Sequence, residues 1–393
     1  MKNNSHLNAD SPCLICGQAR LFVVKEFAAL PRITSDCHPF PAGGELAVCE
    51  NCATVQKIPN QRWLNEIETI YADYAAYSVA GGEEQLVLDP QSGEPRKRSD
   101  VLMRAVSDSG DLPAIARALD IGCGHGVTLM AMAKVFPEWE LFGYEIDESK
   151  RDHLYRIENF KQLYTGDFSR IDGTFNFISM IHSLEHFIDP LRTLRALRRV
   201  AAPGGRLFIE VCNVDENPFD LLVADHLTHF SPGTLAFIAN QAGFGAPMVK
   251  SSWVKKELSL LATKSENEDV RIANVCPSGR KVHEQITASV SWLDALISSA
   301  REVACASDSF GIFGTSIAGT WLATTLGDRV SFFVDEDPHR IGKDYMGKPI
   351  VAPQSVARES TVFMALAPML AQAIKHRLSH LGLDLILPST FYE

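Results

Sequence analysis

Short apolar runs alternate with amphipathic stretches between residues 117 and 263. The run over residues 118–121 leads into the sequence Asp-x-Gly-x-Gly-x-Gly, and an amphipathic stretch over residues 127–136 follows at once. This order predicts a strand, a tight glycine turn and a helix. Because strand and helix patterns keep alternating after it, we expect a parallel sheet covered by helices.

The glycine turn contains Asp120, Gly122 and Gly124. Glycine suits this position because the backbone turns sharply and a ligand must approach it closely. The following helix presents unpaired N–H groups and a partial positive charge at its start. The next apolar run, residues 140–146, carries Glu145, which is placed to bind ribose hydroxyls as the acidic residue after a dinucleotide fingerprint does.

Two Cys-x-x-Cys pairs stand near the start of the chain. Four thiolates suit a tetrahedral zinc ion, so we expect a structural zinc site. A catalytic zinc is disfavoured because four protein ligands leave no open position. The alternatives are a remnant or a redox pair, and Cys37 is interpreted as a loop thiol. The expected ligands are Cys13, Cys16, Cys49 and Cys52.

A second α/β pattern follows a polar boundary at residues 264–271. A long amphipathic helix is expected over residues 280–303, and then a strand, glycine turn and helix over residues 310–319. These glycines do not fit G-x-G-x-x-G, which favours a scaffold without a cofactor. We therefore expect three domains: residues 1–80 with zinc and a tyrosine-rich segment, residues 81–265, and residues 266–393.

Bulk composition narrows the class of protein. At 393 residues, with 46% hydrophobic and 22% charged residues, the chain has the length and composition of a globular protein of two or three domains. A net charge of −11 argues against a nucleic-acid surface. No apolar run reaches membrane-spanning length and no apolar signal segment opens the chain, so we expect a cytoplasmic protein with no membrane partner.

The glycine turn and the acid at the end of the second strand resemble motif I of the class I S-adenosylmethionine (SAM) methyltransferases. Three further stretches are similar to that family: residues 166–168, which include Asp167, residues 175–187 and residues 202–210. The resemblance implies a doubly wound sheet that binds SAM. It places Asp120, Gly122 and Gly124 at the cofactor, Glu145 at the ribose and Asp167 near the adenine.

The order of cysteine pairs, SAM domain and second α/β domain resembles the sugar C-methyltransferases. Residues 334–343 and 347–353 are similar to the last domain of that family. The resemblance implies methylation of a ring carbon of a nucleotide-linked deoxy-ketosugar, held between the middle and last domains. The C-terminal domain would then be a Rossmann-like substrate domain.

The same resemblance suggests catalytic residues. The acid-histidine pair of the family corresponds to Asp225 and His226, and His182 matches a second family histidine. Tyr77 matches the family tyrosine, with Tyr74 as the competing match. The family has Tyr-x-Glu-His where this chain has Val223-Ala-Asp-His, so one phenol is missing and the acid is shorter.

The expected chemistry explains these residue types. A ketone acidifies the neighbouring C–H, and a histidine can remove that proton near neutral pH. The enolate oxygen needs a hydrogen-bond donor, and the carbanion then attacks the sulfonium methyl in line. Three alternatives stay open: His226 as a structural histidine, an O- or N-methyltransferase for another small metabolite, and a non-catalytic scaffold with a vestigial SAM fold.

Overall fold

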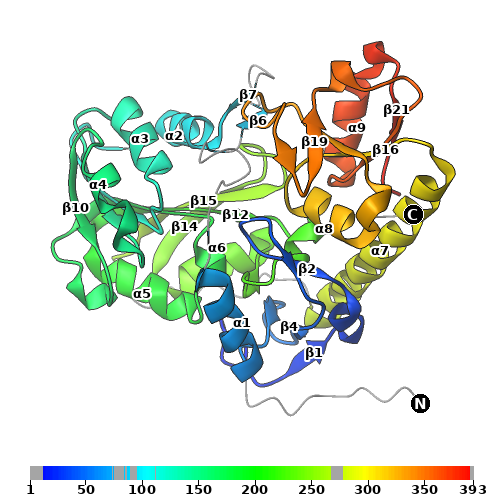
Figure 1. Ribbon diagram of the computed structural model, residues 1–393. Coiled ribbons are helices and arrows are strands. Elements are labelled where there is room, and N and C mark those ends of the chain that lie inside the picture. Colours follow the sequence, from blue (N-terminus) through cyan, green and yellow to red (C-terminus); the bar gives the residue numbers. More distant parts are fainter. Residues whose placement is uncertain are drawn as a thin grey trace.

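The computed structural model describes residues 12–72, 74, 84, 86–88, 95–110, 112–266 and 278–389. Three sheets dominate this part of the chain, one of four strands, one of seven and one of six. Figure 1 shows the seven-stranded sheet on one side of the molecule, the six-stranded sheet on the other, and the N-terminal elements below and between them.

The seven-stranded sheet confirms the expected parallel α/β core. Its first five strands run parallel, and the last two form an antiparallel hairpin. The hairpin begins at Phe244. In spatial order the strands are β10 (Phe160–Tyr164), β9 (Glu140–Tyr144), β8 (Arg117–Ile121), β11 (Phe175–Ile181), β12 (Ala201–Cys212), β15 (Glu257–Lys264) and β14 (Phe244–Lys250).

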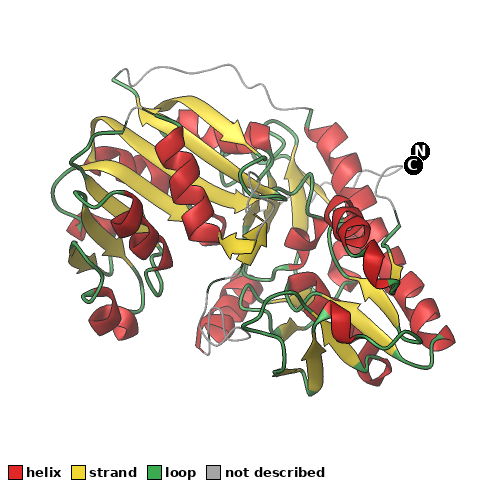
Figure 2. Ribbon diagram, turned by 90° about the horizontal axis from the view of Figure 1, so that it is seen from above, coloured by secondary structure: helices red, strands yellow, loops and turns green. Residues whose placement is uncertain are grey.

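Helices cover both faces of this sheet, as Figures 1 and 2 show. On one face lie α2 (Arg98–Asp108) and α3 (Val127–Val135), and on the other α5 (Pro190–Val200) and α6 (Pro232–Gln241). Local sequence fixes where α5 and α6 start. Each has proline in its first turn, and Asp189 or Ser231 caps the unpaired backbone N–H groups. A short helix, α4 (Arg151–Leu154), lies beside β10.

The N-terminal region forms a small sheet of its own. The order is β1 (Leu21–Val23), β4 (Leu46–Cys49), β5 (Val55–Lys57) and β13 (Thr228–His229). The fourth strand thus comes from a segment about 170 residues further along the chain. Around this sheet lie β2 (Arg32–Ile33), β3 (Pro39–Phe40) and α1 (Gln61–Ala72), and β6 (Leu86–Leu88) pairs with β7 (Pro95–Lys97).

The C-terminal region is a second, six-stranded α/β unit, as the sequence predicts. The long helix α7 (Gly279–Ala306) precedes it and contacts both this unit and the N-terminal sheet. The strand order is β18 (Asp344–Tyr345), β19 (Lys348–Val351), β17 (Phe332–Val334), β16 (Phe310–Phe313), β20 (Thr361–Met364) and β21 (Asp384–Ile386), with helices α8 (Ile317–Leu326) and α9 (Pro368–Arg377).

The hydrophobic cores cross the expected domain boundaries. Leu21 and Ala47 pack into the core of the seven-stranded sheet, whereas Phe27 and Val48 pack with α7 and the C-terminal unit. The N-terminal region therefore lacks an independent core among the described residues and is built into both larger parts. No helix in the described ranges is long and apolar enough to cross a membrane.

Candidate active site

The glycine turn after β8 has the geometry that its sequence requires. Gly122, Gly124 and Gly126 have φ of 73°, 47° and 77°, a conformation that L side chains rarely adopt. Asp120 is buried and accepts a hydrogen bond of 2.5 Å from the hydroxyl of Ser179. Burial raises the pKa of Asp120 to about 7, so this carboxyl group is a fixed part of the turn rather than a surface charge.

The two acids predicted to contact the cofactor lie at neighbouring strand ends. Glu145 follows β9, and its carboxylate accepts hydrogen bonds from the backbone N–H groups of Gly124 (2.9 Å) and Ile146 (2.7 Å). Asp167 follows β10, is exposed, and accepts a hydrogen bond from the N–H of Ser169. Glu145 is thus held against the glycine turn, where a cofactor ribose would have to bind.

His182 stands directly after β11 with a positive φ of 47°, which is uncommon for a residue with a side chain. Its Nδ1 lies 3.3 Å from Glu185, and its Nε2 lies 3.2 Å from Glu257 on β15. Burial alone would lower the pKa of His182, but the Glu257 carboxylate raises it well above the usual value. The side chain is therefore held as a cation between two acids.

His226 is paired with a carboxylate that the sequence did not single out. Asp220, in the 3-10 helix η6 (Pro218–Leu222), has one oxygen 2.7 Å from Nδ1 of His226 and the other 2.6 Å from Nδ1 of His229. We call these three side chains the Asp220 cluster. All are buried, with exposed fractions of 3%, 6% and 1%. The Asp220 carboxylate offsets the effect of burial and raises the pKa of His226.

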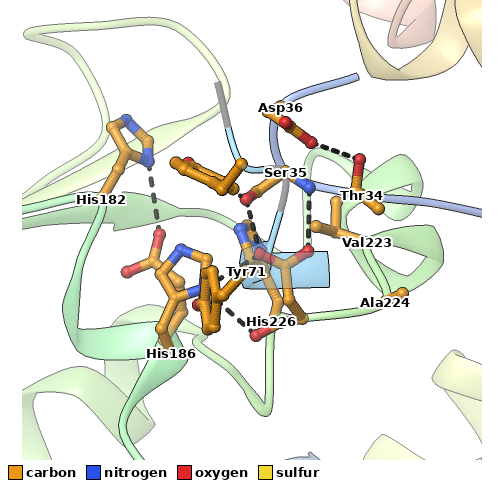
Figure 3. Close-up of polar contacts among 12 residues, drawn as sticks. Thr34, Ser35, Asp36, Tyr71, His182, His186, Val223, Ala224 and His226 are labelled. Carbon is orange, nitrogen blue, oxygen red and sulfur yellow. Dashed lines mark hydrogen bonds and ion pairs between the residues drawn. The ribbon is translucent and has the colours of Figure 1, made fainter. Parts of the chain in front are cut away.

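Asp225 precedes His226 in the sequence, but its carboxylate does not hydrogen-bond the imidazole of His226. Instead its carboxylate accepts hydrogen bonds from the N–H (2.8 Å) and hydroxyl (2.5 Å) of Ser35, in the loop between β2 and β3 (Figure 3). It also lies 3.4 Å from His186. The carboxylate that contacts the imidazole of His226 is therefore that of Asp220 and not that of Asp225.

A second histidine packs against His226. The ring of His186, in the 3-10 helix η5 (Leu184–His186), meets the ring of His226 edge to face at 4.7 Å. Nδ1 of His186 lies 3.1 Å from both the carbonyl oxygen of Asp225 and the hydroxyl of Tyr71 (Figure 3). Burial and the neighbouring His226 lower the pKa of His186.

The predicted catalytic tyrosine, Tyr77, lies outside the described residues. Tyr74, the competing match, is described: its hydroxyl lies 3.3 Å from that of Ser35, and its ring packs against Tyr71. Tyr71 itself reaches His186, although the sequence favoured a core role for it. Phenol groups from the end of α1 therefore stand beside the histidines.

The 3-10 helix η5, which carries His186, lies next to the glycine turn. A Cβ atom on Gly122 would come within 2.9 Å of Cβ of Ser183, the residue before η5. Glu185 and His186 follow in η5, and the carbonyl oxygen of Glu185 accepts a hydrogen bond of 2.7 Å from the N–H of Leu227. The segments that carry His186 and His226 therefore lie at the same edge of the sheet as the glycine turn.

Lys57 at the end of β5 completes the surroundings of the Asp220 cluster. It is fully buried, and its ammonium group donates to the carbonyl oxygens of Val223 and His226 (2.7 Å for His226) and lies 3.4 Å from Nε2 of His229. Burial lowers the pKa of Lys57 to about 7. Burial also lowers the pKa of His229 to about 4, and the Lys57 charge adds to this.

The four cysteines near the N-terminus come together as predicted. Sγ of Cys13 lies 3.5 Å from that of Cys52, Sγ of Cys16 lies 3.5 Å from that of Cys49, and all four sulfurs are within 4.8 Å of one another. Tetrahedral Zn–S bonds of about 2.3 Å would separate the sulfurs by about 3.8 Å. The four thiols therefore fit one tetrahedral ion.

Two other groups of residues have ligand atoms within 4.8 Å of one another: Glu185, His186 and His226, and the Asp220 cluster. In the Asp220 cluster the short contacts join carboxylate oxygens to ring nitrogens, which is a hydrogen-bond arrangement. The Glu185 group could hold a cation only by using the nitrogen of His226 that Asp220 leaves free. A metal ion there would therefore compete with proton transfer.

Comparison with known proteins identifies the central part of the chain. Residues 92–246 match a family described as "Methyltransferase domain". These residues form a class I SAM-dependent methyltransferase domain. A ubiquinone biosynthesis O-methyltransferase of Xanthomonas axonopodis pv. citri is 30% identical over 128 residues, which are 30% of this chain and 54% of that protein. This chain thus spans about half the length of the curated relatives that it matches.

Solved structures resemble the methyltransferase domain more distantly. The mitomycin 7-O-methyltransferase MmcR is 22% identical with a TM-score of 0.37, covering 43% of this chain and 53% of that one. A SAM-dependent methyltransferase from Aquifex aeolicus is 20% identical with a TM-score of 0.35, covering 45% of this chain and 90% of that one. The N- and C-terminal regions lie outside the family match.

The sequence did not single out the groups around His226. Asp220 stands six residues before His226, with no motif to mark it, and Lys57 is far away in the chain. His229 and His186 are absent from the residues that the sequence singled out as catalytic. One signal was present: three histidines at residues 186, 226 and 229 beside several acids would be unusual for a purely apolar core.

Replacing Asp220 with asparagine should destabilise the protein by about 3–5 kcal/mol, because it removes the partner of a buried charge. The pKa of Asp220 is held well below its usual value because His229 and His226 outweigh burial, and the pKa of His226 is raised. The lowered carboxyl pKa stabilises the fold above about pH 4, and the raised histidine pKa does so below about pH 6.5.

The cost of Asp220→Asn should therefore be largest between these two pH values and should shrink as the pH rises through the pKa of His226. Urea unfolding of both proteins from pH 4 to pH 9 measures this. Asp328→Asn, which removes a fully exposed carboxylate, is the matched control. A loss that is the same at every pH would contradict the ion pair.

Proposed function

We propose that this chain transfers a methyl group from SAM to a small acceptor that His226 deprotonates. The observation that carries the proposal is the buried contact of 2.7 Å between Asp220 and Nδ1 of His226, beside the glycine turn of a methyltransferase domain. With its proton on Nδ1, the imidazole has a lone pair on Nε2, and the raised pKa makes it a stronger base.

The acceptor that we propose is a nucleotide-linked deoxy-ketosugar, methylated at carbon. Two features support it: the order of cysteine cluster, methyltransferase domain and C-terminal α/β unit, and the packing of His186 against His226. His226 would take the proton from the carbon next to the ketone. The resulting enolate carbon would attack the sulfonium methyl, leaving S-adenosylhomocysteine and a protonated His226.

We propose that a phenol, Tyr77 or Tyr74, or His182 donates a hydrogen bond to the enolate oxygen. Both ring nitrogens of His182 lie beside acids, Glu185 and Glu257, so His182 would have to leave one of these acids to donate. Asp225 would act through Ser35 and His186, by holding the N-terminal loop against the site.

The second candidate function is O-methylation. It is favoured by the curated relatives, which are named O-methyltransferases and are similar to about 30% of this chain. The same Asp220–His226 pair could deprotonate a hydroxyl group. Only exchange of a carbon-bound proton distinguishes the two functions, because an O-methyltransferase has no reason to exchange it.

We propose that SAM binds across the glycine turn, with its ribose on Glu145 and its adenine near Asp167. Gly122 and Gly124, at positive φ, let the backbone approach the cofactor, and Asp120 braces the turn through Ser179. We further propose that Cys13, Cys16, Cys49 and Cys52 bind one structural zinc ion. Bound there, zinc would tie the two cysteine turns together and stabilise the fold.

His226→Ala should leave SAM affinity nearly unchanged while turnover falls by roughly 10²–10⁴-fold, the usual worth of a positioned base. Asp220→Asn should lose more turnover than Asp225→Asn, because Asp220 alone of the two contacts the imidazole directly. His376→Ala, at an exposed histidine on α9, is the control.

The same variants test the acceptor class. A nucleotide-linked ketosugar is incubated with the enzyme in D₂O without SAM, and deuterium entering the carbon next to the ketone is measured by mass spectrometry. We expect exchange with the natural protein and none with His226→Ala. Methyl transfer without exchange would favour the O-methylation alternative, and equal exchange by both proteins would exclude His226 as the base.

Glu145→Ala should weaken SAM binding by about 1–3 kcal/mol, the cost of leaving buried polar groups without a partner. Isothermal titration calorimetry with SAM measures this, and Glu148→Ala, at an exposed acid three residues away, is the matched control. Unchanged affinity would place the ribose elsewhere. Tighter binding of NAD than of SAM would contradict the cofactor assignment as a whole.

Metal analysis after dialysis should find about one zinc ion per chain, as expected for a single four-thiolate site. Chelation, or Cys16→Ser, should lower the melting temperature because metal binding contributes directly to folding. Cys305→Ser, at an exposed cysteine outside the cluster, should not. A metal-free protein with an unchanged melting temperature would rule out a structural zinc site.

A further inference from the structure

Lys57 is the only lysine among the described residues that is fully buried, and its position in the N-terminal sheet explains why. It ends β5, which pairs antiparallel with β13, so Gln56 stands opposite Thr228 and Val55 opposite His229. The N–H of Lys57 donates 2.8 Å to the carbonyl oxygen of Leu227. This pairing carries the lysine side chain from the cysteine-rich region to the segment that bears the candidate base.

The three contacts of the Lys57 ammonium use all of its protons. An ammonium group has three N–H donors and no acceptor. Two protons go to the carbonyl oxygens of Val223 and His226, and the third points to Nε2 of His229 at 3.4 Å. When Lys57 is protonated, Nε2 of His229 offers it a lone pair, and the proton of that ring sits on Nδ1, where it is donated to Asp220.

The lone pair of His229 matters because Asp220 serves two imidazoles at once. If His229 took a second proton it would become a cation 2.6 Å from Asp220 and would neutralise much of the carboxylate charge. The charge would then no longer act on His226 through the other oxygen, 2.7 Å away. The Lys57 ammonium, 3.4 Å from Nε2 of His229, opposes the addition of that second proton.

We propose that Lys57 is a positioning residue of the candidate active site: it keeps His229 neutral, so that the charge of Asp220 acts on His226. The proposal rests on the proposed role of His226 as the base. It makes the cysteine-rich N-terminal region a contributor to the chemistry, since Lys57 comes from that region and the base does not.

Other charged groups also act on Lys57 and the Asp220 cluster, and they are the same in all the variants below. Asp225 and Glu185 lie on the side of His226, and Arg32 and Glu66 act on Lys57. The Phe27 ring lies 6.0 Å from the ammonium. None of these groups contacts Nε2 of His229 among the described residues, so the effect assigned to Lys57 is separable from theirs.

The first test needs no turnover. Long-range ¹H–¹⁵N spectra of the full chain labelled with ¹⁵N-histidine report the protonation of each ring. In the natural protein His229 should stay neutral, with its proton on Nδ1, down to about pH 5. A His229 that titrates near or above its ordinary value of about 6.5 in the natural protein would overturn the proposal without any variant.

Lys57→Met keeps the length of the side chain and removes its charge. The pKa of His229 should then rise from about 4, because the Lys57 charge that adds to the effect of burial is gone. Lys25→Met, at an exposed lysine of the same region, is the matched control and should change nothing. If His229 stays neutral from pH 5 to pH 8 in Lys57→Met, Lys57 does not control it and the proposal fails.

A rescue experiment separates this role from mere support of the fold. In His229→Asn the amide nitrogen takes the place of Nδ1, so the donor to Asp220 remains, but the side chain cannot be charged. Lys57→Met alone should lower kcat about tenfold, which is less than the loss of about 10²-fold or more expected when a base is removed. The acid limb of the pH–rate profile should move to lower pH, because the pKa of His226 falls.

The double variant, Lys57→Met with His229→Asn, should recover most of that loss. If Lys57 served only to hold the carbonyl oxygens of Val223 and His226, the double variant would stay as slow as Lys57→Met, which would overturn the proposal. If instead His226→Ala loses no turnover while the ring of His229 behaves as described, the proposed base is wrong and the link between Lys57 and His229 still stands.

Discussion

The candidate site depends on a single buried carboxylate. Asp220 is 3% exposed, and a carboxylate removed from water is costly unless its charge is compensated. Two ring nitrogens, at 2.6 and 2.7 Å, supply that compensation. The contact with His226 also fixes the orientation of its ring and raises its pKa. The interaction that stabilises the buried charge of Asp220 therefore also strengthens His226 as a candidate base. Any change that compensates Asp220 in another way reduces its effect on His226.

This carboxylate also explains why the N-terminal region cannot be regarded as a separate appendage. β13 supplies the fourth strand of the N-terminal sheet, and the pairing of β5 with β13 brings Lys57 to the Asp220 cluster. Ser35 holds Asp225 from the other side, and the hydroxyl of Tyr71, near the end of α1, lies 3.1 Å from Nδ1 of His186. The apolar residues of this region are divided between two larger cores. A structural zinc ion at its tip would therefore stabilise the surroundings of the base as well.

The sequence predicted what depends on local periodicity. The alternation of apolar runs and amphipathic stretches predicted the parallel sheet, the glycine spacing predicted the turn at Gly122, and the cysteine spacing predicted the four-sulfur cluster. Groups joined only by long-range packing left no such pattern. Lys57 looks like the polar end of a short strand, and Asp220 lies in a one-turn helix between two apolar residues. Asp225 was predicted from the acid-histidine pair of the family, but it lies in a turn, and its carboxylate contacts Ser35 and His186 instead of His226.

The division between local and long-range features bears on which acceptor the enzyme uses. The glycine turn, Asp120 and Glu145 lie within the methyltransferase domain match, and the cofactor proposed to bind there is common to acceptors of many kinds. The groups that surround His226 come partly from outside that match: Lys57 from β5, Ser35 from the loop after β2, and Tyr71 from α1. The curated O-methyltransferases are similar to only 30% of this chain, which is too little to include all the groups that surround His226. The acceptor must therefore be inferred from the Asp220 cluster and its neighbours, and a base whose pKa is raised by a buried carboxylate suits the removal of a weakly acidic C–H proton.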